Sequence, residues 1–211
     1  MQTPTGTLMQ LELDPRFYYL SNFQQALTWL QERSGDLLSE SEHEFLLQFW
    51  AMDTAAQALL VRMIMRKGSH FRLSKLDYAE IGCTRQAAKA LLDAGWIQHD
   101  AELTLDELFN LLRKDEVLEH LGSTPKQKAL KKSELLEQLS ETYTEPRPFA
   151  AWCPAADEQI LSLTIDALCE RLRLMFFGNL HQDWSEFVLA ELGIFRYEPV
   201  ALTADSRAFR H

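Results

Sequence analysis

Apolar residues in the first third of the chain recur every three or four positions. Between residues 17 and 32 this spacing predicts a helix with one buried stripe, because an α-helix brings such positions onto one face. Ser39 and Glu42 have the spacing of a capping box, which predicts the start of a second helix. A third helix is expected from about 54 to 67, where Gly68 can end it. Residues 1–16 show little periodicity, so we expect a flexible leader there.

A winged-helix-like unit is expected at residues 71–99. Ser74 can cap a short helix, and Thr84 can cap a second helix that ends before Gly95. Residues 96–98 are typical of a short strand. Two short helices followed by a strand form the outline of a winged helix-turn-helix. The outer side of its second helix would carry Arg85, Gln86 and Lys89.

The pattern stays mainly helical to the end of the chain. Residues 103–140 read as leucine-rich helices separated by a lysine-rich loop, which is the order in which a SAP motif presents a basic loop. The prolines in 145–153 predict a linker. Residues 154–211 read as a helical hairpin over 157–177 and 183–192, the first helices of an α-helical repeat domain. The predicted fold class is therefore mainly α, with a DNA-binding region at 17–144.

The charge of the chain is unevenly distributed. Its net charge of −10 disfavours a nucleic-acid partner, because binding to phosphates requires Lys and Arg. Two stretches, 54–76 and 122–133, nevertheless carry basic residues and no acid, and such basic islands remain compatible with DNA. They hold Arg62, Arg66, Lys67, Arg72 and Lys75 in the first stretch, and Lys126, Lys128, Lys131 and Lys132 in the second.

Arg62 and Arg66 are the strongest candidates for phosphate contacts. They are four residues apart on the predicted third helix and so should project from one face. Arg binds phosphate through two parallel hydrogen bonds. Tyr18, Tyr19 and Tyr78 are candidates for stacking on a sugar or base, although aromatic residues at helical spacing are more often core residues. The alternative for the arginines is a solvated face on which Arg62 pairs with an acid such as Glu44.

No catalytic or metal-binding pattern is evident. No acid is followed two positions later by Lys, as restriction-type nucleases require, and the three cysteines form no CxxC pair. We therefore assign no catalytic residue, no metal ligand and no cofactor to this chain. No apolar stretch is long enough to cross a membrane and no secretory signal starts the chain, so the expected location is cytoplasmic, nucleoid-associated when bound to DNA.

Four ordered blocks carry a family resemblance. Residues 18–23, 57–68, 71–81 and 179–198 resemble the N-terminal region of the Fanconi-associated, VRR-type nuclease family in its bacterial form. The resemblance implies a front half that binds branched DNA, a helical-repeat domain, and a C-terminal VRR-type domain that cleaves near 5′ flaps with Mg²⁺ or Mn²⁺ and trims 5′ ends in interstrand-crosslink repair. It also implies that Arg62, Arg66 and Lys67 contact phosphates, with Tyr18 and Tyr78 near that surface.

The family's catalytic motifs lie beyond the position equivalent to His211, so this chain is expected to bind DNA without cutting it, with the nuclease domain as its partner in cis. Two other functions stay open. A winged-helix transcription regulator would read bases through Arg85, Gln86 and Lys89. A helical protein-interaction module would use the basic islands only as surface.

Overall fold

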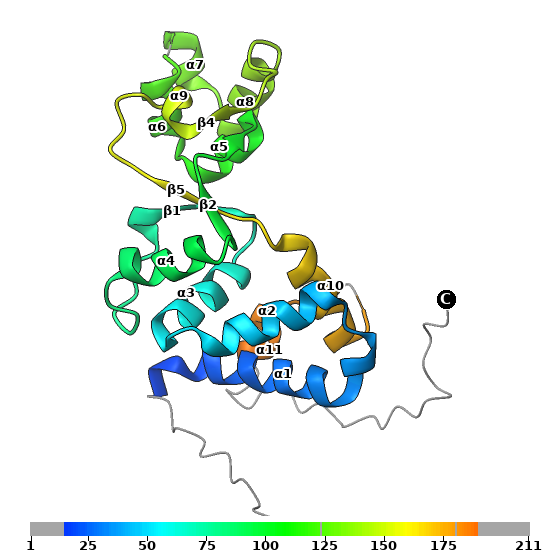
Figure 1. The fold of residues 1–211 in the computed structure, drawn as a ribbon. Helices are drawn as coiled ribbons and strands as arrows, with labels where there is room; N and C mark the ends of the chain where they lie inside the picture. Colours follow the sequence, from blue (N-terminus) through cyan, green and yellow to red (C-terminus); the bar gives the residue numbers. More distant parts are fainter. Residues whose placement is uncertain (1–14, 123, 180, 190–211) are drawn as a thin grey trace, which may run out of the picture.

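The computed structural model describes residues 15–122, 124–179 and 181–189 (Figure 1). Nearly all of the expected leader lies outside these residues, and Pro15–Phe17 forms the short 3₁₀ helix η1. No helix in the described part of the chain is both long and apolar enough to cross a membrane.

Three helices build most of the first core. They are α1 (Tyr18–Ser34), α2 (Glu40–Ala51) and α3 (Thr54–Ile64). The predicted capping box at Ser39 and Glu42 is present and starts α2, while Asp53 caps α3 by accepting from Ala56. The third helix ends three residues earlier than predicted, so Arg66 and Lys67 follow it instead of lying on it. If Arg62 and Arg66 face the same side of the molecule, tertiary contacts rather than one helix must bring them there.

A three-stranded antiparallel sheet lies beside α4 (Thr84–Asp93), in the order β1 (His70–Arg72), β5 (Ile160–Leu163) and β2 (Ile97–His99). The winged-helix-like outline is confirmed in α4 and β2. The helix predicted after Ser74 is wrong, because the 3₁₀ helix η3 (Leu73–Lys75) and turns occupy that segment. Thr84 does not cap α4 but donates to the Leu76 carbonyl at 2.5 Å.

The second core belongs to a smaller unit, residues 102–152, which we call the second unit. Its elements are β3 (Glu102–Leu103), α5 (Leu105–Leu111), α6 (Lys114–His120), α7 (Pro125–Ala129), α8 (Lys132–Ser140), β4 (Arg147–Pro148) and α9 (Phe149–Trp152). Figure 1 shows these helices beyond the sheet, away from α1, α2 and α3. The lysine-rich segment predicted as a loop contains α7.

The predicted linker at 145–153 is packed structure. Strand β4 pairs with β3, and Trp152, which is 2% exposed, donates its indole N–H to the Leu103 carbonyl at 3.0 Å. The helix predicted from 157 begins only at Asp166, because Ile160–Leu163 forms the central strand β5. Leu161 and Leu163 lie in the first core and Ile160 in the second. Strand β5 therefore joins the two cores.

The predicted helical hairpin consists of α10 (Asp166–Phe177) and α11 (Trp184–Leu189). Gly178 ends α10 with a φ of 69°, a conformation that favours glycine. The hairpin packs on α1 through Trp184, whose ring centroid lies 5.0 Å from that of Phe23. These elements, α1 to α4 and the sheet form the first unit, residues 15–99 and 160–189. That α10 and α11 open a repeat domain remains a prediction.

Candidate nucleic-acid interface

The two arginines singled out in the sequence meet at one aromatic ring. The Arg62 guanidinium carbon lies 3.8 Å from the ring centroid of Tyr19 and 4.8 Å from that of Tyr78. Arg66 approaches Tyr78 at 5.5 Å. Guanidinium groups stack favourably on aromatic faces, so the tyrosines fix the direction of both cations. We call Arg62, Arg66, Tyr19, Tyr78 and Glu80 the arginine cluster.

Glu80 holds Arg62 in place. Its Oε1 accepts from Arg62 Nη2 at 2.5 Å, from Arg62 Nε at 3.2 Å and from the Tyr19 hydroxyl at 3.1 Å. The alternative that Arg62 pairs with an acid is therefore correct, but the acid is Glu80 and not Glu44. Burial alone would lower the pKa of Arg62, but its hydrogen bonds to Glu80 and Tyr19 raise it. Arg62 is thus a fixed, permanently charged group whose side chain is 26% exposed.

This region holds three exposed cations and also the exposed acid Asp77. Arg66, Lys67 and Lys75 are all exposed, and Arg66 Nη2 donates to the Lys75 carbonyl at 3.4 Å, which brings the segments after α3 and around η3 together. Tyr18 is half-buried and contacts Tyr19 edge to face, with ring centroids 5.8 Å apart. The cluster therefore presents exposed cations beside a half-buried Tyr78, an arrangement that suits a phosphate backbone.

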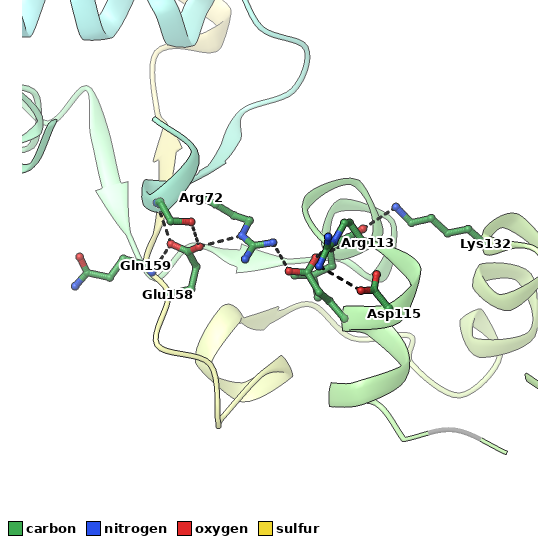
Figure 2. A network of polar contacts seen from close by, with 9 residues as sticks. Arg72, Arg113, Asp115, Lys132, Glu158 and Gln159 are labelled. Carbon is green, nitrogen blue, oxygen red and sulfur yellow. Dashed lines mark hydrogen bonds and ion pairs between the residues drawn. The ribbon is translucent and has the colours of Figure 1, made fainter. Parts of the chain in front are cut away.

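Arg72 does not join this surface. Its Nε donates to Glu158 at 2.9 Å and its Nη1 to Glu116 at 2.7 Å, and its side chain is 18% exposed (Figure 2). A guanidinium held by two carboxylates is poorly placed to neutralise a phosphate. We therefore leave Arg72 out of the proposed DNA-contacting set, in contrast to the expectation from its position in the basic stretch.

The lysines of the second unit are exposed around α7 and the start of α8. Lys126 and Lys128 lie on α7, Lys131 is the N-cap residue of α8, and Lys132 begins α8. Lys132 also donates through Nζ to the Leu112 carbonyl at 2.7 Å, so part of its role is to hold α8 against the end of α5. The structure thus places the two basic islands on different units, and contact with both requires one ligand to span the units.

The carboxylates that hold these arginines make stability sensitive to acid. Burial by itself raises the pKa of Glu80, but its hydrogen bonds to Arg62 lower the net value below the ordinary 4.5. The unfolded chain then binds protons more readily than the folded chain, so this stabilisation is complete above about pH 4.5 and is lost as the pH falls through the folded-state pKa. At pH 7, we expect Glu80→Gln to lower the unfolding free energy by about 1–2 kcal/mol.

Urea titrations of the chain and of Glu80→Gln at pH 7, 5, 4 and 3 measure this effect. The difference in unfolding free energy between the two proteins should narrow below about pH 4.5, where the Glu80 carboxylate of the unfolded chain begins to bind a proton. A gap that stays constant down to pH 3 would show that the Arg62–Glu80 pair does not carry the predicted stabilisation.

With this geometry established, comparisons with known proteins agree with the division into two units. The family model described as the FAN1 HTH domain matches residues 17–98, and the model described as the Fanconi anemia-associated nuclease SAP domain matches residues 102–152. The chain belongs to the Fanconi-associated nuclease family. Its fold is the mainly helical one of the family's HTH and SAP domains, and the expected fold class is confirmed.

Relatives in the Fanconi-associated nuclease family match most of this chain. The Fanconi-associated nuclease 1 homolog of Pseudomonas aeruginosa is 52% identical over 92% of the chain, and the Oryza sativa homolog is 32% identical over 91% of it. These matches cover 35% and 21% of the two relatives, so the chain spans about a third or less of their length.

Solved structures of the family agree. A crystal structure described as paFAN1 bound to 2nt 5'flap DNA with gap superimposes with a TM-score of 0.81 and 51% identity, covering 94% of this chain and 36% of that one. A second, described as paFAN1 bound to 1nt 5'flap DNA with gap, gives a TM-score of 0.80 over 92% of this chain. At this identity the likeness extends to both units.

The sequence did not point to Glu80 of the arginine cluster, and Tyr19 was a stacking candidate that the family resemblance did not place at the DNA-binding surface. Tyr19 is buried, and Glu80 is an acid that follows the basic stretch 54–76. Neither therefore has the features of a DNA contact. Tyr78 and Glu80 are two residues apart, and this spacing is only a weak signal that both face Arg62. Only the fold places Glu80 beside α3.

Proposed function

We propose that this chain is the DNA-binding region of a structure-specific nuclease and binds 5′-flapped DNA through its phosphate backbone. The observation that carries the proposal is the arginine cluster, in which tyrosines and Glu80 orient Arg62 and Arg66 beside the exposed Lys67 and Lys75. The family relatives solved with 5′flap DNA support the same ligand.

Backbone contacts suit an enzyme that recognises a DNA shape. Phosphate contacts set position and orientation without reading bases, so one protein can act on a junction of any sequence. The first unit offers the arginine cluster and the second offers the exposed lysines of α7 and α8. We propose that the two sets bind separate stretches of backbone on one branched DNA.

The complete nuclease is proposed to cleave near 5′ flaps and trim 5′ ends in interstrand-crosslink repair, using Mg²⁺ or Mn²⁺ in a VRR-type domain in cis. The part of the chain that the structure describes offers no fitting set of ligands for that metal. Within residues 15–122, 124–179 and 181–189, no group of three or more His, Cys, Asp or Glu side chains could hold a metal ion. We propose DNA binding for this chain and metal-dependent cleavage for the VRR-type domain.

Fluorescence anisotropy on a labelled 5′ flap, a nicked duplex and an intact duplex tests the proposal. We expect the flap to bind most tightly and excess unlabelled flap of unrelated sequence to compete fully, because shape and phosphates carry the affinity. With Mn²⁺ present, a gel should show the DNA uncut.

Two results would contradict this function. A strong preference for one duplex sequence would favour the transcription regulator, whose bases would be read through the exposed residues Arg85, Gln86 and Lys89 of α4. Equal and salt-independent binding to all three DNAs, or none, would favour the protein-interaction module.

A further inference from the structure

Strand β1 presents two side chains to the second unit. His70 and Arg72 are two residues apart and half-buried, whereas Phe71 between them is buried in the first core. Alternate residues of a strand point to the same side, so His70 and Arg72 face away from the first core together. Both of them contact carboxylates of the second unit.

Arg72 contacts the glutamate that caps α6. Glu116 Oε2 accepts from the backbone N–H of Arg113 at 2.7 Å, which is the capping contact at the start of α6. Its other oxygen, Oε1, accepts from Arg72 Nη1 at 2.7 Å. Arg72 also binds Glu158, which accepts from the Ser74 backbone N–H at 3.1 Å and from the Ser74 hydroxyl (Figure 2).

His70 repeats this arrangement with the glutamate that caps α5. Glu107 Oε2 accepts from the Thr104 backbone N–H at 2.7 Å, and Glu107 Oε1 lies 3.2 Å from His70 Nε2. The other ring nitrogen of His70, Nδ1, is 2.8 Å from the Ser162 hydroxyl on β5. Each capping carboxylate thus uses one oxygen for its own helix and the other for β1.

Two connections of the chain also join the units. The chain passes from the first unit to the second over Asp100 and Ala101 and returns over residues 153–159. Figure 1 shows the second unit at one end of the molecule, joined to the rest near the sheet. The contacts of His70 and Arg72 lie at this junction, where a small rotation would move the distant lysines of α7 and α8 furthest.

We propose that His70 and Arg72 are positioning residues for DNA binding, which fix the second unit through Glu107 and Glu116, the glutamates that cap α5 and α6, so that the basic residues of both units engage one DNA. The inference rests on the proposed function. Its physical basis is effective concentration: once the first unit is bound, a rigidly placed second unit meets the same DNA without a further orientational search.

The test places glutamine at the two capping positions that β1 contacts, in the complete chain. Glutamine retains the capping box, so Glu107→Gln/Glu116→Gln keeps the helix starts and removes the charges that β1 holds. Glu119→Gln/Glu134→Gln is the matched control, because it removes two charges from the same unit, one of them at the capping position of α8, without touching β1. Arg72→Gln breaks the Glu116 contact from the other side.

Two measurements are made on each protein. Spin labels at Gln25→Cys on α1 and Gln138→Cys on α8, both exposed positions, report the distance between units in a background in which the exposed Cys83 is replaced by Ser. Anisotropy reports affinity for a long 5′ flap. Circular dichroism melts check that each protein is folded before the comparison is made.

We expect the Glu107→Gln/Glu116→Gln and Arg72→Gln proteins to show a broader distance distribution and about tenfold weaker flap binding, as avidity is lost. The control should match the unaltered chain. The loss would occur although both glutamate changes make the chain less acidic, which by charge alone favours DNA.

Unchanged distance distributions in these variants would overturn the proposal, and so would unchanged flap affinity. The distance measurement needs no DNA. If the unaltered chain failed to bind the flap, the proposed function would fall, while the role of His70 and Arg72 in placing the second unit would still be decided by the distances.

Discussion

Reversing two exposed charges beside the arginine cluster should weaken DNA binding about tenfold or more. Arg66→Glu/Lys67→Glu removes two cations and adds two anions at a proposed phosphate-binding surface, and each lost phosphate contact also forfeits the release of counterions. Both residues are exposed and follow the end of α3, so the fold should tolerate the change. Changing Arg62 is less informative, because its loss would also unpair Glu80. Anisotropy on the 5′ flap at about 0.1 M salt measures the effect.

The matched control is Arg85→Glu/Lys89→Glu on α4. It reverses the same amount of charge at two exposed positions of the first unit. We expect this control to lose clearly less affinity than Arg66→Glu/Lys67→Glu. The opposite order would move the DNA-binding surface to α4, where the winged-helix regulator would have it.

The second large effect concerns the boundary that the sequence predicts for the DNA-binding region. A chain of residues 1–144 should fail to fold cooperatively. It lacks β5, which bonds to both β1 and β2 and contributes Leu161 to the first core, and it lacks Trp152, which fills the second. Truncating one large core side chain to Ala costs about 2–5 kcal/mol, so losing several would approach the whole stability of a domain, about 5–15 kcal/mol.

Thermal melts followed by circular dichroism compare residues 1–144 with the complete chain. Leu161→Ala in the complete chain is the intermediate case, expected to melt cooperatively at a lower temperature. A single sharp melt for residues 1–144 near that of the complete chain would contradict the shared role of β5 in the two cores.

The elements that the sequence predicts correctly are those that local rules control. The capping box at Ser39 and the apolar spacing of α1 depend on residues close together in the chain. Strand β5 follows no such rule. All four of its residues are buried and three of them are apolar, and so short a run fits a strand or a buried helix equally well. Its pairing partners lie in β1 and β2, far away in the sequence, so only tertiary structure decides between the two.

The candidate site also has one feature that the sequence predicts and one that it does not. The pairing of Arg62 and Arg66 on one side of the molecule was predictable from their spacing, although Tyr78 rather than a continuous helix brings them together. The sequence could not predict that Arg62 joins the arginine cluster whereas Arg72 is held between Glu116 and Glu158. Both lie in a stretch without acids, and their carboxylate partners come from elsewhere in the chain, 18 residues away for Glu80 and 86 for Glu158.

The salt dependence of binding tests most directly whether both units hold the DNA backbone. The logarithm of the association constant should fall linearly with the logarithm of salt concentration, with a slope near −0.9 for each phosphate neutralised on duplex DNA. We expect a steep slope for the unaltered chain. It should become shallower by about two in Arg66→Glu/Lys67→Glu and by a similar amount in Lys126→Gln/Lys128→Gln. A slope near zero, or one that neither variant changes, would contradict the account.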